Sequence, residues 1–101
     1  MKMLMVVFRD SLQDEVLMLL KDCDVKAYTL VQNVAGAGET GMALGSFASP
    51  GVNSMLLVVL SKEQADRSIE ALKAYRDGLA EEHPTHKVPI RVFVLPCAEV
   101  V

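Results

Sequence analysis

The chain contains four short apolar segments and two amphipathic segments, which are separated by polar residues. The apolar segments span residues 2–8, 27–34, 55–60 and 89–95. Short apolar runs bounded by polar residues predict strands, and the first and third are apolar at nearly every position, which is typical of strands buried on both faces. In residues 27–34 the pattern alternates, and one face is expected to carry Tyr28, Leu30, Gln32 and Val34.

The two amphipathic segments predict helices. The first begins at Ser11, where Asp14 three residues later completes a Ser-x-x-Asp capping pattern. The second begins at Ser61, with Gln64 at the same spacing, and is expected to fray into a polar connector over residues 78–87. Its inward stripe is predicted to consist of Ala65, Ile69, Leu72 and Leu79.

The predicted order is β-α-β-β-α-β, which indicates an α+β, ferredoxin-like fold in a single domain, residues 1–101. This fold places two helices on one face of a four-stranded antiparallel sheet. Two helices cannot cover both faces, yet the apolar first and third strands predict that both are buried. We therefore expect a homo-oligomer in which copies of the chain bury their open sheet faces against each other.

Composition and charge exclude several classes of partner. The formal net charge is −3, and Lys and Arg form no cluster, which argues against nucleic acid and anionic membranes. No apolar run approaches the roughly 20 residues that a membrane-spanning helix needs. The apolar N-terminal segment is interrupted by Arg9, Asp10 and Asp14, so it does not have the pattern of a signal peptide. We therefore expect a cytoplasmic protein. Cys23 and Cys97 are expected to be free thiols.

A glycine-rich segment over residues 36–53 is the strongest candidate for function, because it contains five of the six glycines of the chain. Its Gly-x-Gly-x-x-Gly string matches the dinucleotide-binding fingerprint, but the next element is a strand rather than the helix which that site needs. Exposed backbone N–H groups, with the Thr40 and Ser46 hydroxyls, make a plausible cradle for an anion. A long hairpin loop that binds nothing is the alternative.

Arg91 and the histidines are the other candidates. A charge inside an apolar strand needs a partner, an edge or a ligand, so Arg91 is either a ligand contact or an edge-strand guard against aggregation. Arg9 stands at the end of the first strand in a similar setting. His83 and His86 form a His-x-x-His pair, but most metal sites need further ligands, so a solvated connector is the competing interpretation.

Two stretches resemble the PII signal-transduction family. They are Val34-Ala35-Gly36-Ala37-Gly38, at the base of the glycine-rich segment, and Phe93-Val94-Leu95-Pro96-Cys97-Ala98-Glu99, which fits the family's Phe-Val-x-Pro-x-x-Glu pattern. The resemblance implies a homotrimer that binds a small anionic effector, such as an adenine nucleotide, between subunits and regulates a transporter or an enzyme through this T-loop-like segment. It implies that the residues shaping one side of that cleft are Gly36, Gly38, Glu39, Thr40 and Gly41, with Arg91 supplying positive charge.

The chain departs from the PII pattern in three places. The loop segment is shorter and lacks the tyrosine modified in many family members. The family's phosphate-binding Gly-Asp-Gly-Lys aligns with Val88-Pro89-Ile90-Arg91, which keeps only the final basic residue. We also expect the family's basic C-terminal tail to be missing, since Val100 and Val101 follow Glu99.

A second resemblance is to CutA-type trimers, carried by His83-Pro84, Pro89 and Leu95-Pro96. It implies a divalent-metal-binding trimer involved in metal tolerance. The candidate ligands for this hypothesis are His83 and His86, with Cys97 as an additional candidate. A small enzyme without a cofactor is a third hypothesis, but the sequence offers no paired acid and base or nucleophile for it. We therefore expect a binding protein rather than an enzyme.

Overall fold

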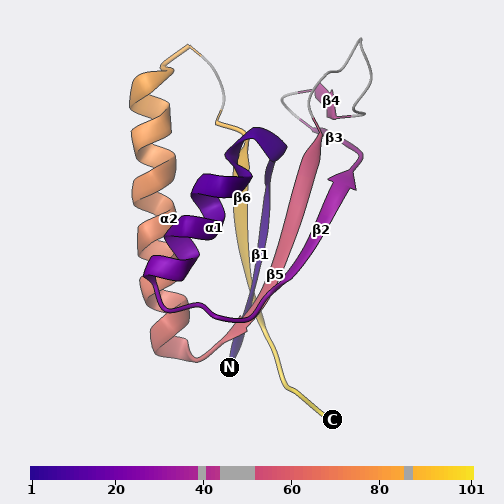
Figure 1. Cartoon of the computed structure of the whole chain (residues 1–101), viewed down its shortest axis with the longest axis vertical. Helices are drawn as coiled ribbons and strands as arrows, with labels where there is room; N and C mark the ends of the chain where they lie inside the picture. Colours follow the sequence, from indigo (N-terminus) through magenta and orange to yellow (C-terminus); the bar gives the residue numbers. More distant parts are fainter. Residues whose placement is uncertain (39–40, 44–51, 86–87) are drawn as a thin grey trace.

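The computed structural model describes residues 1–38, 41–43, 52–85 and 88–101. Along the chain it contains β1 (Lys2–Arg9), the short 3-10 helix η1 (Asp10–Leu12), α1 (Gln13–Asp22), β2 (Thr29–Val34), β3 (Gly36–Gly38), β4 (Gly41–Ala43), β5 (Asn53–Leu60), α2 (Lys62–Glu82) and β6 (Ile90–Pro96). Strands β2, β5, β1 and β6 form one antiparallel sheet in that order (Figure 1). Both α-helices lie on one of its faces, which confirms the predicted ferredoxin-like fold.

The central pair of strands is β1 and β5, the two segments that are apolar at nearly every position. They pair over their full length, from Lys2 opposite Leu60 to Arg9 opposite Asn53. Central strands have both edges paired and both faces available for burial, which is where continuous apolar runs belong. β2 and β6 are the edges of the sheet.

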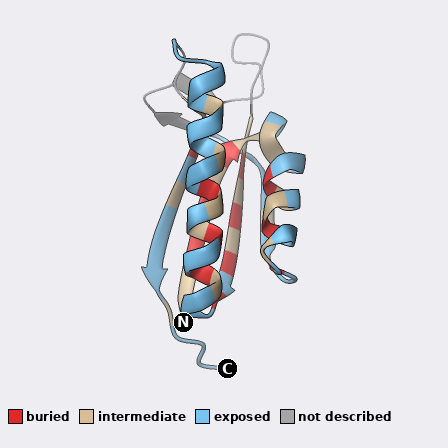
Figure 2. Cartoon of the chain, turned by 90° about the vertical axis from the view of Figure 1, so that its left-hand side faces the viewer, coloured by how far each residue is buried: buried red, intermediate tan, exposed pale blue. Residues whose placement is uncertain are grey.

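The core lies between the sheet and the two helices (Figure 2). Alternate residues of β1 and β5 point toward the helices, because side chains on a strand alternate between its faces. The fully buried large side chains of this layer include Leu4, Phe8, Leu20, Leu56 and Leu72. Burial of each such side chain stabilises the fold by about 1.5–3 kcal/mol.

One of the two predicted helix caps is confirmed. The Ser61 Oγ accepts a hydrogen bond of 3.2 Å from the backbone N–H of Gln64. The prediction at Ser11 was wrong: this residue lies in η1, and α1 begins at Gln13 without a side-chain cap. A tight 3-10 turn connects the end of β1 to α1 there.

Helix α2 is longer than predicted, since it continues through Gly78 and ends only at Glu82. A glycine inside a helix costs about 1 kcal/mol relative to alanine. Sixteen residues before it and four after it are helical, and packing of the helix on the sheet outweighs this local preference. Of the predicted inward stripe, Ala65 and Leu72 are buried and Ile69 packs against the core.

Strand β2 contains a β-bulge that the alternating pattern did not predict. Its register with β5 shifts between Val31 and Val34, and Asn33 has a left-handed backbone with φ of 59°. Asparagine tolerates this conformation better than most residues. The bulge turns Val34 to the face of the sheet away from the helices, opposite Asn53, whereas the Gln32 side chain bonds to Gln13 of α1. The expectation that Gln32 and Val34 share a face was wrong.

Candidate functional site

The face of the sheet away from the helices, here called the open face, is largely apolar. Three cross-strand rows of the sheet register make up its middle part: Val31, Met55, Val7 and Arg91; Thr29, Leu57, Met5 and Phe93; and Val59, Met3 and Leu95. Phe93 is half exposed, and Val31, Val59 and Leu95 are also exposed. A contiguous apolar face of this kind marks an interaction surface.

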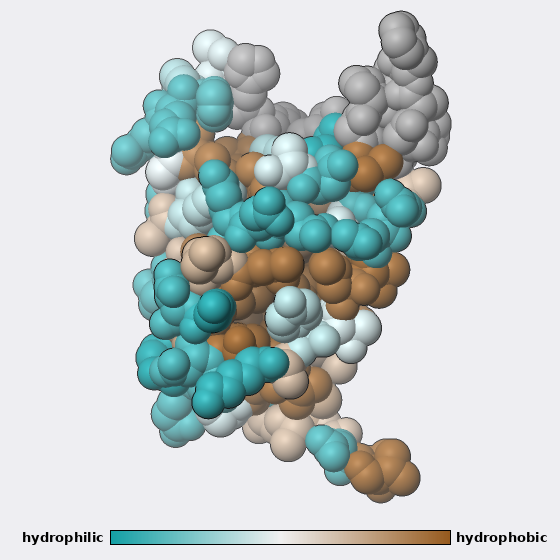
Figure 3. All heavy atoms as spheres, viewed as in Figure 1, coloured by the Kyte–Doolittle hydropathy of each residue, from teal (hydrophilic) through white to brown (hydrophobic). Residues whose placement is uncertain are grey.

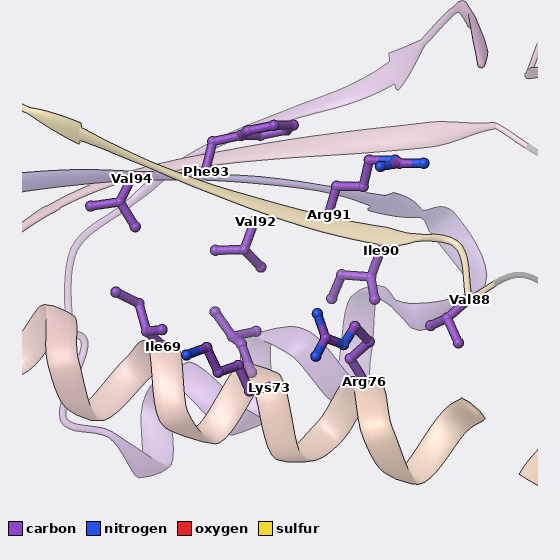
Figure 4. A pocket seen from close by; sticks show the side chains of 10 residues that line it. Ile69, Lys73, Arg76, Val88, Ile90, Arg91, Val92, Phe93 and Val94 are labelled. Atoms are coloured by element: carbon purple, nitrogen blue, oxygen red, sulfur yellow. The ribbon is translucent and has the colours of Figure 1, made fainter. Parts of the chain in front are cut away.

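Positive charge lies at one end of the open face. Arg91 is opposite Val7, and Figure 4 shows Arg91 and Phe93 on the side of β6 away from α2. Arg9 ends the neighbouring strand, and strand alternation places it on the same face. The Arg9 Nε is buried and has no hydrogen-bond partner within the described part of the chain. The two guanidinium groups therefore make this end of the face suited to an anion.

The glycine-rich segment leaves the sheet at the same end. Val34, the last residue of β2, pairs with Asn53, which in turn pairs with Arg9. Two residues further on, β3 and β4 form a short hairpin with Gly36 opposite Ala43 and Gly38 opposite Gly41 (Figure 1). This hairpin was not predicted. Glu39, Thr40 and Ser46 lie outside the described residues.

Arg91 and the glycine-rich segment lie at opposite edges of the sheet, since β6 is one edge strand and β2 is the other. Three inter-strand steps separate them, or about 14 Å at the usual strand spacing. One copy of the chain therefore does not bring Arg91 against Gly36, Gly38 and Gly41. Among the described residues, a cleft that combined Arg91 with these three glycines would need a second copy of the chain.

Gly36 is not required by packing among the residues that the structure describes. A Cβ atom added there would meet no atom of these residues within 4 Å. Packing among these residues therefore does not require glycine at position 36.

A cavity of about 770 Å³ lies on the other side of β6, between this edge strand and α2 (Figure 4). Its apolar lining includes Ile69, Val88 and Val92, and Lys73 and Arg76 project toward it from α2. Both cations already have acidic neighbours: the Lys73 Nζ lies 3.7 Å from Glu70, and the Arg76 Nη2 lies 3.1 Å from Asp77. This cavity could not be predicted from local sequence patterns, because its residues come from segments about 20 positions apart.

The metal-site hypothesis gains no further ligand from the structure. His83 follows the end of α2, and His86 lies outside the described residues. Cys97 follows β6 at the opposite end of the sheet, beside the start of β1, so it does not lie near His83. Within the described ranges, no three His, Cys, Asp or Glu side chains come together in a metal-binding group. Cys23 and Cys97 are free, as predicted.

The family model for nitrogen regulatory protein P-II matches residues 1–101. The chain belongs to the PII family. Members of this family are signalling regulators that bind small-molecule effectors. The resemblance found in the sequence motifs is thereby confirmed, and the ferredoxin-like fold agrees with it.

Solved PII-like structures share the fold. CPII from Thiomonas intermedia, in a complex with ADP, AMP and bicarbonate, is 22% identical over 93% of this chain and 84% of its own, with a TM-score of 0.68. A PII-like signalling protein from Thermus thermophilus is 23% identical over 93% of this chain and 85% of its own, with a TM-score of 0.60. The comparison with curated proteins found no match. Among the described helices of this PII protein, none has the length and hydropathy to cross a membrane.

Proposed function

We propose that this PII protein is a homotrimeric cytoplasmic regulator that binds an adenine nucleotide in clefts between its subunits. The open faces would form the interface between copies. Each cleft would combine the glycine-rich segment of one copy, including Gly36, Gly38, Glu39, Thr40 and Gly41, with Arg91 and Arg9 of a neighbour. The observation that carries the proposal is the placement of Arg91 and the glycine-rich segment at opposite edges of one sheet.

The ligand class is supported by charge and by the related structures. Two arginines at the end of the open face favour an anion, and guanidinium groups bind phosphate and carboxylate oxygens in a bidentate manner. CPII, which shares this fold, binds ADP together with AMP and bicarbonate. We propose that ligand binding orders the contact between the glycine-rich segment and a transporter or enzyme partner, and that the protein itself catalyses no reaction.

Calorimetric titration of the full-length protein with ADP, AMP and sodium bicarbonate tests the proposal. ADP should bind, and Arg91→Ala should weaken its affinity at least tenfold, because the variant removes one charge-assisted contact worth about 1.5–3 kcal/mol. Arg67→Ala is the matched control. Arg67 is an exposed arginine of α2 whose guanidinium lies 3.9 Å from Asp24, away from the open face.

Sedimentation of both variants should match that of the wild type. If Arg91→Ala remains assembled and binds ADP as tightly as Arg67→Ala does, Arg91 is not a ligand residue. If the wild type binds none of the three ligands, the adenine-nucleotide assignment is wrong.

A further inference from the structure

The outer surface of the helical layer carries a groove of about 650 Å³ between α1 and α2. Its apolar floor includes Met18, Leu19, Ala71 and Tyr75, and Met18 is 58% exposed. Figure 3, which has α1 toward the viewer, shows apolar surface between the hydrophilic side chains of this face. The groove lies on the far side of the molecule from the open face, so an oligomer formed through the sheets would leave it accessible.

The rim of the groove is acidic. It is formed by Asp14, Glu15 and Asp22, and no Lys or Arg is among the described residues that line the groove. Glu15, Met18 and Asp22 follow a spacing of three and then four residues, which places them along one stripe of α1. The two carboxylates of this stripe are two turns apart, or about 10 Å along the helix axis. The apolar side chain of Met18 thus lies between the negative charges of Glu15 and Asp22, which are held at a defined separation.

One of these carboxylates is held in place by the other helix. The Tyr75 hydroxyl of α2 donates a hydrogen bond to Glu15 Oε2. Burial raises the pKa of Tyr75 well above its usual value, and the hydrogen bond to Glu15 acts in the same direction. The phenol therefore remains a donor at physiological pH. The Glu15 carboxylate is oriented before any partner arrives, which lowers the entropy lost on binding.

We propose that this acidic groove is a docking site for a cationic amphipathic helix of a partner protein. Such a helix would place an apolar side chain on the Met18 floor and a Lys or Arg beside each of Glu15 and Asp22, two turns apart. Helices commonly bind to apolar grooves in this way, with flanking charges setting specificity. A second copy of this chain is not expected to bind in the groove. It carries the same acidic rim and a net charge of −3, so the two negative surfaces would repel each other.

The test uses the full-length protein and a synthetic helical peptide of about 18 residues, a length that supports a helix when alanine-rich. The peptide carries one leucine flanked by lysines at i and i+7, and its twin carries glutamate in place of each lysine. Fluorescence anisotropy should show saturable binding of the lysine peptide that weakens with salt, and no binding of the glutamate twin.

Two double variants form a matched pair, since each removes two negative charges. Glu15→Gln/Asp22→Asn should weaken peptide binding about tenfold, because two surface ion pairs of up to about 1 kcal/mol each are lost. Glu63→Gln/Glu81→Gln removes two carboxylates of α2 that do not line the groove and should bind like the wild type. Met18→Lys should abolish binding.

Equal binding by both double variants, or binding of the glutamate twin, would overturn the docking proposal. ADP titration of Glu15→Gln/Asp22→Asn separates this inference from the proposed nucleotide site. The ADP affinity should be unchanged, because the open face lies on the other side of the sheet.

Discussion

Arg91 of β6 lies directly opposite Val7 of β1, on the open face of the sheet. This pairing places a permanent positive charge at the margin of an apolar surface. Val7 lies two residues before Arg9, which ends β1. Apolar contact and anion binding are therefore adjacent on the same face. Assembly and ligand binding in this PII protein are expected to involve neighbouring residues, which separate variants can distinguish.

A charge in the middle of the open face should disrupt assembly. Met5 lies between Leu57 and Phe93 in one cross-strand row. Met5→Asp would bury an unpaired carboxylate in the proposed interface, at a cost of several kcal/mol. We expect monomers in sedimentation velocity experiments.

Met18→Asp is the control for this assembly prediction, because Met18 is exposed on the helical side. It should sediment like the wild type. A Met5→Asp variant that is folded and still has the wild-type sedimentation coefficient would show that the open face is not the interface.

The two serines predicted as helix caps should respond differently to substitution. Ser61→Ala removes the acceptor for the Gln64 N–H and should lower the free energy of unfolding by about 1 kcal/mol. Ser11 makes no cap hydrogen bond to α1, so Ser11→Ala should change stability by less than about 0.5 kcal/mol. Urea denaturation of the two variants measures both values, and similar losses would contradict the assigned helix starts.

Gln13 should contribute to stability by linking α1 to two strands. Its Oε1 accepts hydrogen bonds from Gln32 Nε2 at 3.0 Å and from Ser54 Oγ at 3.3 Å. Ser54 is only 1% exposed, so Gln13→Ala leaves a buried hydroxyl without this acceptor. We expect a loss of about 1–2 kcal/mol in the free energy of unfolding.

Removal of the Ser54 hydroxyl as well should offset part of that loss. The double variant Gln13→Ala/Ser54→Ala is expected to be less destabilised than the sum of the single variants. Additive losses in urea denaturation would indicate that the Gln13–Ser54 hydrogen bond contributes nothing.

The Tyr75–Glu15 hydrogen bond should make stability depend on alkaline pH. The folded state raises the pKa of Tyr75 above the unfolded value of 10.0, so it favours the protonated phenol. That contribution is complete below the unfolded pKa and is lost as pH rises toward the folded pKa. Thermal unfolding temperatures of wild type and Tyr75→Phe should therefore differ at pH 8 and converge above pH 10. A difference that grows with pH would contradict the assignment.

The sequence by itself determined the order of the two helices and the four strands of the main sheet, the fold class and the family. Apolar periodicity is a local property: the continuous runs in β1 and β5 require central strands, and the stripe through Ala65 and Leu72 requires a helix packed on them. The Ser61 cap is also local, because donor and acceptor lie three residues apart. The glycine-rich motif and the C-terminal Phe-Val-x-Pro-x-x-Glu pattern were sufficient to indicate the PII family.

Only the tertiary structure decided where the functional residues lie relative to one another. The bulge at Asn33 depends on pairing with β5, and the extension of α2 through Gly78 depends on packing against the sheet. The positions of Arg91 and the glycine-rich segment at opposite edges follow from strand order, which joins residues more than 50 positions apart. The groove between α1 and α2 exists only where the two helices pack together. Local sequence patterns do not predict such contacts, because the contacts form between segments that are far apart in the sequence and pack in one core.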